Sequence, residues 1–463
     1  MKKLKLYNSL TNTLEDFIPI DAGNVRLYSC GPTVYASPHI GNARPLVVFD
    51  ILYRVLGRLY DNCVTYARNI TDVDDKINAR AKLENISIGE LTTAVTAEFH
   101  KNLKLLNVLP VTHEPRATDH INEMLSLIDA LMVNGFAYES EGHVLFRVKK
   151  MAQYGMLSKR SVDDMIAGSR VEVAVYKEDP MDFVLWKPSK DGDPAWDSKY
   201  GPGRPGWHIE CSAMSHKYLG KQFDIHTGGQ DLMFPHHENE LAQNFGAFGC
   251  IMANYWIHNG MLLVDNQKMS KSLGNIISLD DILKKYDGEA IRYVLLSTHY
   301  QKTLNWTNQS VTHALQALDR LYGALANTCA PNTCHDASVQ TDFSVLDALC
   351  ANLNTPLALK YLHDLADKIY KSSDADEIDR LGCLLRQEAG ILGLLQKNPD
   401  AWFRNNSAEL DENKIQQLIN EREKAKKEKN FSLADEIRAK LLENNVKIED
   451  TRDGAVWKLL RNH

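Results

Sequence analysis

The stretch that decides the fold runs from Tyr28 to Asp50 and begins Tyr28-Ser29-Cys30-Gly31-Pro32-Thr33-Val34-Tyr35-Ala36-Ser37-Pro38-His39-Ile40-Gly41-Asn42. Residues 25–30 are predicted to form a buried strand, which Gly31-Pro32 ends because proline has no N–H for a ladder hydrogen bond. From Val48 onward the apolar residues recur at helical spacing. The segment from His39 to Asn42 therefore lies where a strand and a loop lead into the N-terminus of a helix.

This helix terminus is a candidate phosphate site, because its free N–H groups and the positive end of the helix dipole attract anions. Gly41 has no side chain, so a flat ligand can approach the backbone closely. His39 can donate a hydrogen bond to a phosphate oxygen. An ordinary junction between a loop and a helix, with a surface histidine, is the alternative for so short a motif.

A second polar stretch, Lys268-Met269-Ser270-Lys271-Ser272, follows an apolar segment and precedes Gly274. Two lysines and two hydroxyl groups make a cationic loop that suits phosphates, although a solvated turn has the same composition. The two stretches occur in one chain and in this order, and together they resemble the HIGH and KMSKS signatures of class I aminoacyl-tRNA synthetases. One position departs from that pattern, because Asn42 stands where the pattern has its second histidine. An amide can donate a hydrogen bond but cannot carry a charge.

Length and composition set the broad class. A chain of 463 residues suggests roughly two to four domains. A hydrophobic content of 44% is ordinary for a soluble protein, and no apolar run approaches the ~18 residues of a membrane span. We therefore expect a cytoplasmic protein without a signal peptide or membrane segment. The net charge of −7 means that a nucleic acid would have to bind a local basic patch.

The eight cysteines show no spacing typical of a disulfide framework, which favours a reducing compartment. Six of them match no motif and are expected to be packing or surface residues: Cys63, Cys250, Cys329, Cys334, Cys350 and Cys383. A second zinc site at Cys329 and Cys334 is a weak alternative.

A second strand is expected from Cys63 to Ile70, which completes a strand–helix–strand unit typical of a Rossmann-like doubly wound parallel sheet. Ligands of such sheets bind beyond the carboxyl ends of the strands, where Cys30, His39 and Thr71 all lie. Asp74 and Asp75 follow, and acidic residues there are equally well explained as a helix cap. Residues 77–134 are predicted to be mostly helical and 138–149 to be a strand. An insertion from about 110 to 205 then separates the two halves of the sheet.

Zinc-ligand residue types gather near the predicted strand ends. Residues 223–231 are expected to be a strand that ends in a glycine-rich turn, and Pro235 suits the first turn of the helix that follows. His236 and Glu240 are then four apart on one helical face. With Cys30 and Cys211 they make four zinc-ligand types, although His236 and Glu240 at this spacing are also compatible with a surface pair.

Four stretches carry a narrower resemblance: Gly31-Pro32-Thr33-Val34-Tyr35, Arg68-Asn69-Ile70-Thr71-Asp72, Gly206-Trp207-His208-Ile209-Glu210-Cys211-Ser212 and His236-His237-Glu238-Asn239-Glu240. They are similar to the cysteinyl-tRNA synthetase family. The resemblance implies that Cys30, Cys211, His236 and Glu240 hold one zinc ion that binds the substrate cysteine.

The resemblance also implies the substrate contacts. Thr71 would line the cysteine site, Asp231 would meet the α-ammonium group and Trp207 would close over the substrate, unless Trp207 is a plain core residue. A cysteine-specific enzyme must reject serine, which a hydrophobic pocket distinguishes poorly. Zinc binds a thiolate strongly and a hydroxyl poorly, so an open metal position would supply the specificity.

The implied reaction joins L-cysteine and ATP into cysteinyl-adenylate and pyrophosphate, and then transfers the cysteinyl group to its tRNA. Mg²⁺ would accompany ATP. The residues implied on the ATP side are His39, Gly41 and Asn42 at the phosphates, Lys268 and Lys271 at the pyrophosphate, and His258 and Gly260 beside the adenine.

The catalytic domain is expected to span residues 1–300, followed by an α-helical bundle at 310–400 and a small mixed module at 405–463. The end of the module resembles the family's anticodon-recognition tail, and its lysines at 424, 426, 427 and 429 can neutralise phosphates. Trp457 is a candidate for stacking on an anticodon base, or it packs inside the module. We expect a monomer.

Two other functions fit the same architecture. The first is a cysteine ligase that passes the adenylate to a small amine, which would lack the C-terminal module. The second is a non-catalytic RNA-binding relative, which would have lost zinc ligands or the lysine loop.

Overall fold

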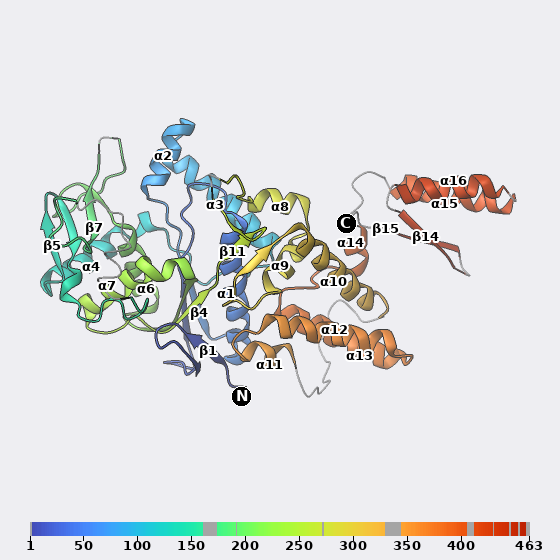
Figure 1. The fold of residues 1–463 in the computed structure, drawn as a ribbon, viewed down its shortest axis with the longest axis horizontal. Coiled ribbons are helices and arrows are strands. Elements are labelled where there is room, and N and C mark those ends of the chain that lie inside the picture. Colours follow the sequence, from blue (N-terminus) through green and yellow to red (C-terminus); the bar gives the residue numbers. More distant parts are fainter. Residues whose placement is uncertain are drawn as a thin grey trace. The chain divides into compact units, whose positions relative to one another are not determined.

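The computed structural model describes residues 2–160, 174–190, 192–270, 273–328, 344–404, 412–428, 430–443, 446–451 and 454–459 (Figure 1). The chain divides into two compact units. The first comprises Met1–Thr307, Asp342–Tyr361 and Ile391–Leu394, and the second comprises Asn308–Thr341, Leu362–Gly390 and Leu395–His463.

A four-stranded parallel sheet, in the order β10-β9-β3-β4, lies in the first unit. Its strands are β3 (Val25–Ser29), β4 (Val64–Arg68), β9 (Phe223–Gly229) and β10 (Ala253–Asn259). Ser29 lies opposite Arg68 on β4 and opposite Thr227 on β9. Because the strands are parallel, their carboxyl ends form one edge of the sheet. The prediction of a Rossmann-like parallel α/β sheet is confirmed.

Helices cover this sheet and supply its core. Helix α1 (Ile40–Leu59) packs against β4, β9 and β10, while α6 (Trp207–Leu219) packs against β3 and β4. The apolar positions that predicted α1 are buried, including Val48, Leu52 and Val55. Helix α7 (Glu238–Phe248) packs against α6 and α4 (Ile121–Val133). Tyr28 of β3, Phe223 of β9, Ile209 of α6 and Leu241 of α7 belong to one apolar cluster, which fixes these elements against one another.

The insertion is an antiparallel sheet in the order β5-β6-β7-β8. Its strands are β5 (Ala137–Ser140), β6 (His143–Phe146), β7 (Phe183–Pro188) and β8 (Gly203–Pro205). The single strand predicted at 138–149 is wrong, because the chain turns back between β5 and β6. Glu141 and Gly142 both have positive φ, at 48° and 74°, as the two-residue turn of a tight hairpin requires.

The first unit contains further helices and strands. The helices are α2 (Asp75–Glu84), α3 (Ile88–Leu105), α8 (Leu279–Lys285), α9 (Gly288–Leu296) and α11 (Val345–Cys350). The strands are β1 (Lys5–Asn8), β2 (Thr13–Asp16), β11 (Leu262–Val264), β12 (Gln267–Lys268) and β13 (Leu304–Trp306).

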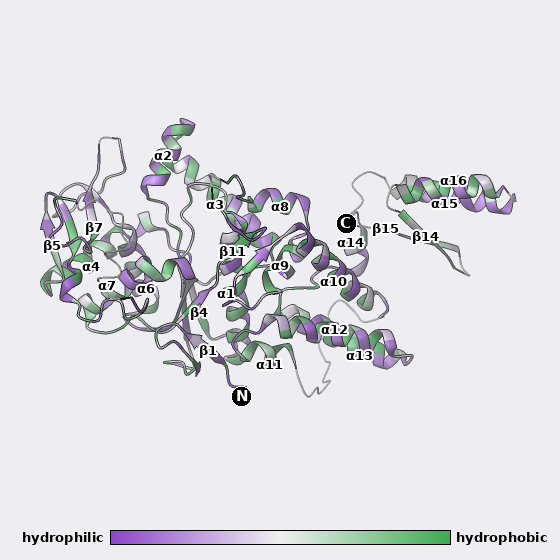
Figure 2. Ribbon diagram, in the orientation of Figure 1, coloured by the Kyte–Doolittle hydropathy of each residue, from purple (hydrophilic) through white to green (hydrophobic). Residues whose placement is uncertain are grey.

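The second unit, in its described part, has helices and one hairpin as its regular elements. It contains α10 (Asn308–Ala326), α14 (Pro399–Arg404), α15 (Glu412–Lys427), α16 (Phe431–Glu443), β14 (Val446–Thr451) and β15 (Gly454–Leu459). Most of α12 (Thr355–Lys371) and α13 (Ala375–Ile391) also belongs to it, and both helices carry hydrophilic and hydrophobic residues along their length (Figure 2). In the C-terminal module Ile415, Ile419, Ile437, Leu441 and Val446 form a small core.

The described helices include none that is both long and apolar enough to span a membrane. Cys383 on α13 is disulfide-bonded, so the expectation of cysteines without disulfides is wrong at this position. Cys329 and Cys334 lie outside the described residues, as does most of the predicted polar connection at 327–342.

Candidate active site

Four side chains converge where the parallel strands end. Cys30 directly follows β3, Cys211 lies in the second turn of α6, and Glu240 lies in the first turn of α7. His236 belongs to the short helical turn η4 (Met233–His237) that leads into α7. Helix α7 begins at Glu238, so the predicted start of a regular helix at Pro235 is wrong, but His236 and Glu240 still face each other four residues apart.

The four groups offer one ligand atom each, and these atoms all lie within 4.8 Å of one another. His236 Nε2 is 2.9 Å from Glu240 Oε1, and that oxygen is 3.2 Å from Cys30 Sγ. Cys211, His236 and Glu240 are at most 1% exposed. The structure thus brings together all four of the residues predicted as zinc ligands.

The remaining polar atoms of His236 and Glu240 are held by two further histidines. His208 Nδ1 lies 2.9 Å from His236 Nδ1, and His226 Nε2 lies 2.9 Å from Glu240 Oε2. Metal-binding histidines and carboxylates are usually oriented by such partners. Two thiols, an imidazole and a carboxylate whose outer atoms are already bonded fit a zinc ion. Cys30, His226, His237 and Glu240 form a second, overlapping group within the same 4.8 Å limit.

Burial and mutual contact shift the pKa values of these groups. Burial, reinforced by Cys211, raises the pKa of the Cys30 thiol well above its usual range. The pKa of Cys211 falls to about 6 because it accepts a hydrogen bond from Cys30. Burial opposes ionisation of Glu240, but His226 and His236 outweigh it and hold its pKa well below the usual value. The site therefore already holds a carboxylate and a thiol that ionises readily.

A chain of histidines continues away from the four groups. His237 Nδ1 lies 2.9 Å from His258 Nε2, and His258 Nδ1 lies 2.8 Å from Ser9 Oγ. Burial, with the neighbouring His226, lowers the pKa of His258 to about 3, so this ring stays neutral. Because both of its nitrogens are engaged, His258 has no polar side-chain atom left for an adenine. Gly260 is buried, and its carbonyl accepts a hydrogen bond from Arg44.

The predicted nucleotide motif caps helix α1. His39 is the N-cap residue, and its Nδ1 accepts the Asn42 backbone N–H at 3.3 Å. The Asn42 side-chain oxygen in turn accepts the His39 backbone N–H at 3.0 Å, so the two residues form a capping box. Burial lowers the pKa of His39, although the negative charge of Asp231 opposes this shift.

The two motifs lie against each other. The backbone N–H of Ile40 donates to the Ile277 carbonyl at 3.0 Å, and the N–H of Leu279 donates to the Pro38 carbonyl at 2.9 Å. A Cβ placed on Gly41 would come within 2.7 Å of the Met269 side chain, so a larger residue at 41 would displace that loop. Lys268 ends β12 and is exposed, while Lys271 lies outside the described residues.

Two of the predicted substrate residues, Trp207 and Thr71, lie beside the four clustered groups. The Trp207 ring stacks on His236 with centroids 4.1 Å apart and is 40% exposed, so it is not a plain core residue. Thr71 is buried, and its hydroxyl donates to Glu210 Oε2 at 3.0 Å. Asp231 is exposed in the turn η3 (Gln230–Leu232) after β9.

Sequence reasoning missed five polar residues beside this site: Asn69, His208, Glu210, His226 and His237. Four of them lie within stretches that carry the resemblance, but ligand spacing drew attention only to their neighbours. His226 lies on β9, and its ring stacks on Trp256 at 4.4 Å. Alternation along that strand was the one available sign of where it points.

Known proteins resemble the chain over nearly its whole length. A model of the tRNA synthetases class I (C) catalytic domain matches residues 16–316, and a DALR domain model matches residues 344–396. The cysteine–tRNA ligase of Paramagnetospirillum magneticum is 51% identical over 457 residues, which cover 98% of this chain and 99% of the relative. That of Rhodospirillum rubrum is 49% identical over 459 residues, with coverages of 98% and 99%.

Solved structures share the fold at low identity. The Mycobacterium tuberculosis methionyl-tRNA synthetase in complex with methionyl-adenylate superposes with a TM-score of 0.57 and 15% identity, over 82% of this chain and 92% of that chain. At such identity the likeness concerns the fold alone. The domain models and the full-length relatives show that the chain belongs to the cysteine–tRNA ligase family of class I tRNA synthetases.

Proposed function

We propose that this protein charges tRNA with cysteine in the cytoplasm, and that it selects cysteine through a zinc ion held by Cys30, Cys211, His236 and Glu240. The observation that carries the proposal is the cluster of these four groups, within 4.8 Å of one another and at the carboxyl edge of the parallel sheet. Such an edge is where sheets of this kind bind their ligands. The full-length relatives are named for the same substrate.

The donor set supports zinc and explains the choice of substrate. Bound zinc would offer an open coordination position that a thiolate fills and a serine hydroxyl does not. His208 and His226 keep the ligand atoms of His236 and Glu240 turned toward the cysteines. The overlapping group with His226 and His237 lacks the second thiol, so we assign the metal to the set that contains both cysteines.

The proposed roles on the nucleotide side follow from the capping box. His39 uses Nδ1 as an acceptor, so its proton lies on Nε2 and can be donated to a phosphate oxygen. Its lowered pKa makes it a neutral donor. Asn42 acts by holding the His39 backbone, and the first-turn N–H groups add to the phosphate site. Lys268 and Lys271 would neutralise the pyrophosphate, with Mg²⁺ bound to ATP, so the protein contributes mainly position and charge.

The proposed cysteine contacts lie around the metal ligands. The exposed face of Trp207, stacked on His236, would cover the bound amino acid. Thr71 and Asp231 would receive its α-ammonium group.

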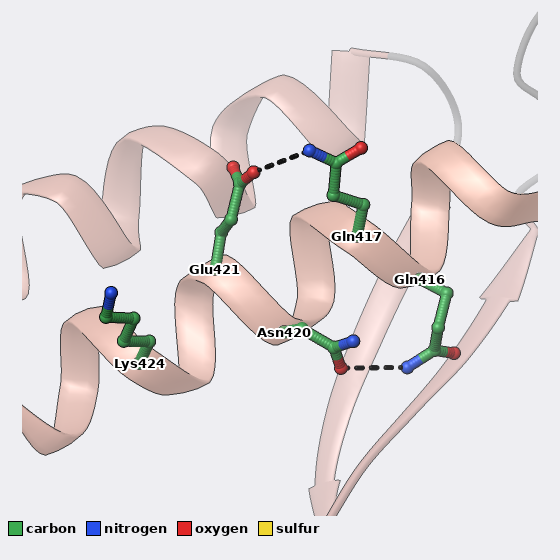
Figure 3. Close-up of a pocket in the computed structure, with 5 residues that line it drawn as sticks. All are labelled: Gln416, Gln417, Asn420, Glu421 and Lys424. Atoms are coloured by element: carbon green, nitrogen blue, oxygen red, sulfur yellow. Dashed lines mark hydrogen bonds between the residues drawn. The ribbon is translucent and has the colours of Figure 1, made fainter.

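The C-terminal module would contact the tRNA. Helix α15 carries a pocket of about 400 Å³ lined by Gln416, Gln417, Asn420, Glu421 and Lys424 (Figure 3). Its amides bond along the helix, Gln416 to Asn420 at 3.2 Å and Gln417 to Glu421 at 3.0 Å. Amide groups can read unpaired base edges and lysines can neutralise phosphates. The relatives match this region as well, which argues against a small-amine ligase that lacks it.

Two assays on one preparation test the proposed function. Pyrophosphate exchange should depend on cysteine and be negligible with serine, and purified tRNA should become cysteinylated. Exchange without tRNA charging would favour the small-amine ligase. The absence of both activities from folded, zinc-loaded protein would favour the non-catalytic alternative.

A further inference from the structure

Asn69 lies among the residues proposed to bind the substrate cysteine, which we call the cysteine side of the site: Cys30, Thr71, Cys211, His236 and Glu240. It directly follows β4 and is 0% exposed. The Gly31 backbone packs directly against the Asn69 backbone, because a Cβ added to Gly31 would come within 1.5 Å of the Asn69 carbonyl oxygen. Only glycine fits at that position, so the segment that carries Cys30 is held in direct contact with Asn69.

The side chain of Asn69 joins three segments of the site. Its Oδ1 accepts the Gly31 backbone N–H at 2.8 Å and lies 3.6 Å from Cys211 Sγ. Its Nδ2 donates to Thr71 Oγ1 at 3.1 Å. A backbone N–H can only donate, so the bond from Gly31 fixes which end of the amide is the oxygen. The end that faces Thr71 must therefore be the donor.

This orientation decides what the Thr71 hydroxyl can do. A hydroxyl has one proton and two lone pairs. The proton of Thr71 is given to Glu210 Oε2 at 3.0 Å, and one lone pair receives the N–H of Asn69. One lone pair remains, so Thr71 is left as an acceptor for a donor such as an ammonium group.

We propose that Asn69 is a positioning residue for the substrate cysteine, which holds Thr71 as an acceptor for the α-ammonium group and fixes the segments of Cys30 and Cys211 beside it. The inference rests on the proposed function. The side-chain contacts of Asn69 described here are with Gly31, Thr71 and Cys211, all on the side proposed to bind cysteine, so its loss should weaken cysteine binding rather than ATP binding.

A double-mutant cycle with Asn69→Asp and Thr71→Val tests this. Aspartate keeps the acceptor for Gly31 but cannot donate to Thr71, and valine removes the hydroxyl at nearly constant shape. The KM values for cysteine and ATP are measured by pyrophosphate exchange, with zinc content determined for each preparation. Asn398→Asp is the matched control, because its Oδ1 also accepts a backbone N–H, that of Asp400 at 2.9 Å, on exposed chain.

Asn69→Asp should raise the KM for cysteine about tenfold or more and leave the KM for ATP within about twofold. In the Thr71→Val background the same change should add less than about twofold, because the acceptor is already lost. Full additivity of the two changes, or an equal rise in both KM values, would overturn the inference. If Asn69→Asp does not fold, the uncharged Asn69→Ser takes its place in the same cycle.

Different results contradict the proposed function and the proposed role of Asn69. Wild-type protein that exchanges pyrophosphate with no preference for cysteine contradicts the function, whatever the variants do. Cysteine-dependent wild-type exchange with an additive cycle contradicts only the role of Asn69.

Discussion

The cysteine side and the nucleotide side of the site are built differently. Cys211, His236 and Glu240 are nearly inaccessible and are tied into a network of buried hydrogen bonds. Asn42 and Lys268 are exposed, and backbone hydrogen bonds join residues 38–40 to residues 277–279 on that side.

The difference matches the two chemical tasks. Recognition of a thiol against a hydroxyl needs ligands that cannot move, which burial and bonded neighbours provide. Phosphates are large and must enter and leave, so cations on exposed chain suit them better. The following changes test this contrast, from the largest expected effect to the smallest.

Cys211→Ser should abolish zinc binding and cysteine recognition. A hydroxyl replaces a zinc-binding thiolate in a buried site, so both metal and cysteine-dependent exchange should be lost, with activity falling by about 10³ or more. Zinc content and exchange rate of the same preparation provide the measurement. Cys63→Ser, at an exposed cysteine, is the control. Normal zinc content in Cys211→Ser would remove this residue from the ligand set.

His39→Ala should slow adenylate formation and leave zinc binding unchanged. Loss of one preorganised donor at a developing charge costs about 10²–10³ in rate. Exchange should fall by this factor, whereas zinc content should be unchanged because His39 belongs to the other part of the site. His313→Ala, at an exposed histidine of α10, is the control. Near-normal exchange would retire the proposed role of His39.

His226→Ala should loosen the metal without removing a ligand. The imidazole holds Glu240 Oε2 at 2.9 Å, and loss of such an orienting partner typically weakens metal binding about 10–100-fold. The rate of zinc transfer to a coloured chelator measures the effect. If the protein instead keeps its zinc as tightly as wild type, Glu240 is held by its other contacts.

Asn42→Ala should have the smallest effect. It removes the side-chain half of the capping box, which is worth about 0.5–1 kcal/mol to the first turn of α1. Hydrogen exchange of the amides at 40–43 should quicken by about two- to fivefold, and the exchange of α6 and α7 should not change. A change spread over both sides of the site would mean that the two sides are not independently built.

The four clustered residues were predicted from the family resemblance of the motifs that contain or adjoin them, because residue types near strand ends and helix starts left a surface pair open as well. His258 shows the limit of that reasoning. The resemblance implied that it lies beside the adenine, but only the packing shows that His237 and Ser9 occupy both ring nitrogens. The hairpin at Glu141-Gly142 was missed because its two strands continue one alternating pattern.

The sequence by itself determined the parallel sheet and the order of its motifs, since periodicity and turn residues act over short distances along the chain. The four residues that meet at the sheet edge followed from the resemblance of their motifs to a known family. Only the tertiary structure decided which atoms of those residues remain free. His208, His226 and Asn69 come from different elements and act through contacts a few ångströms long. Such contacts depend on how the helices and strands pack, and no local pattern encodes them.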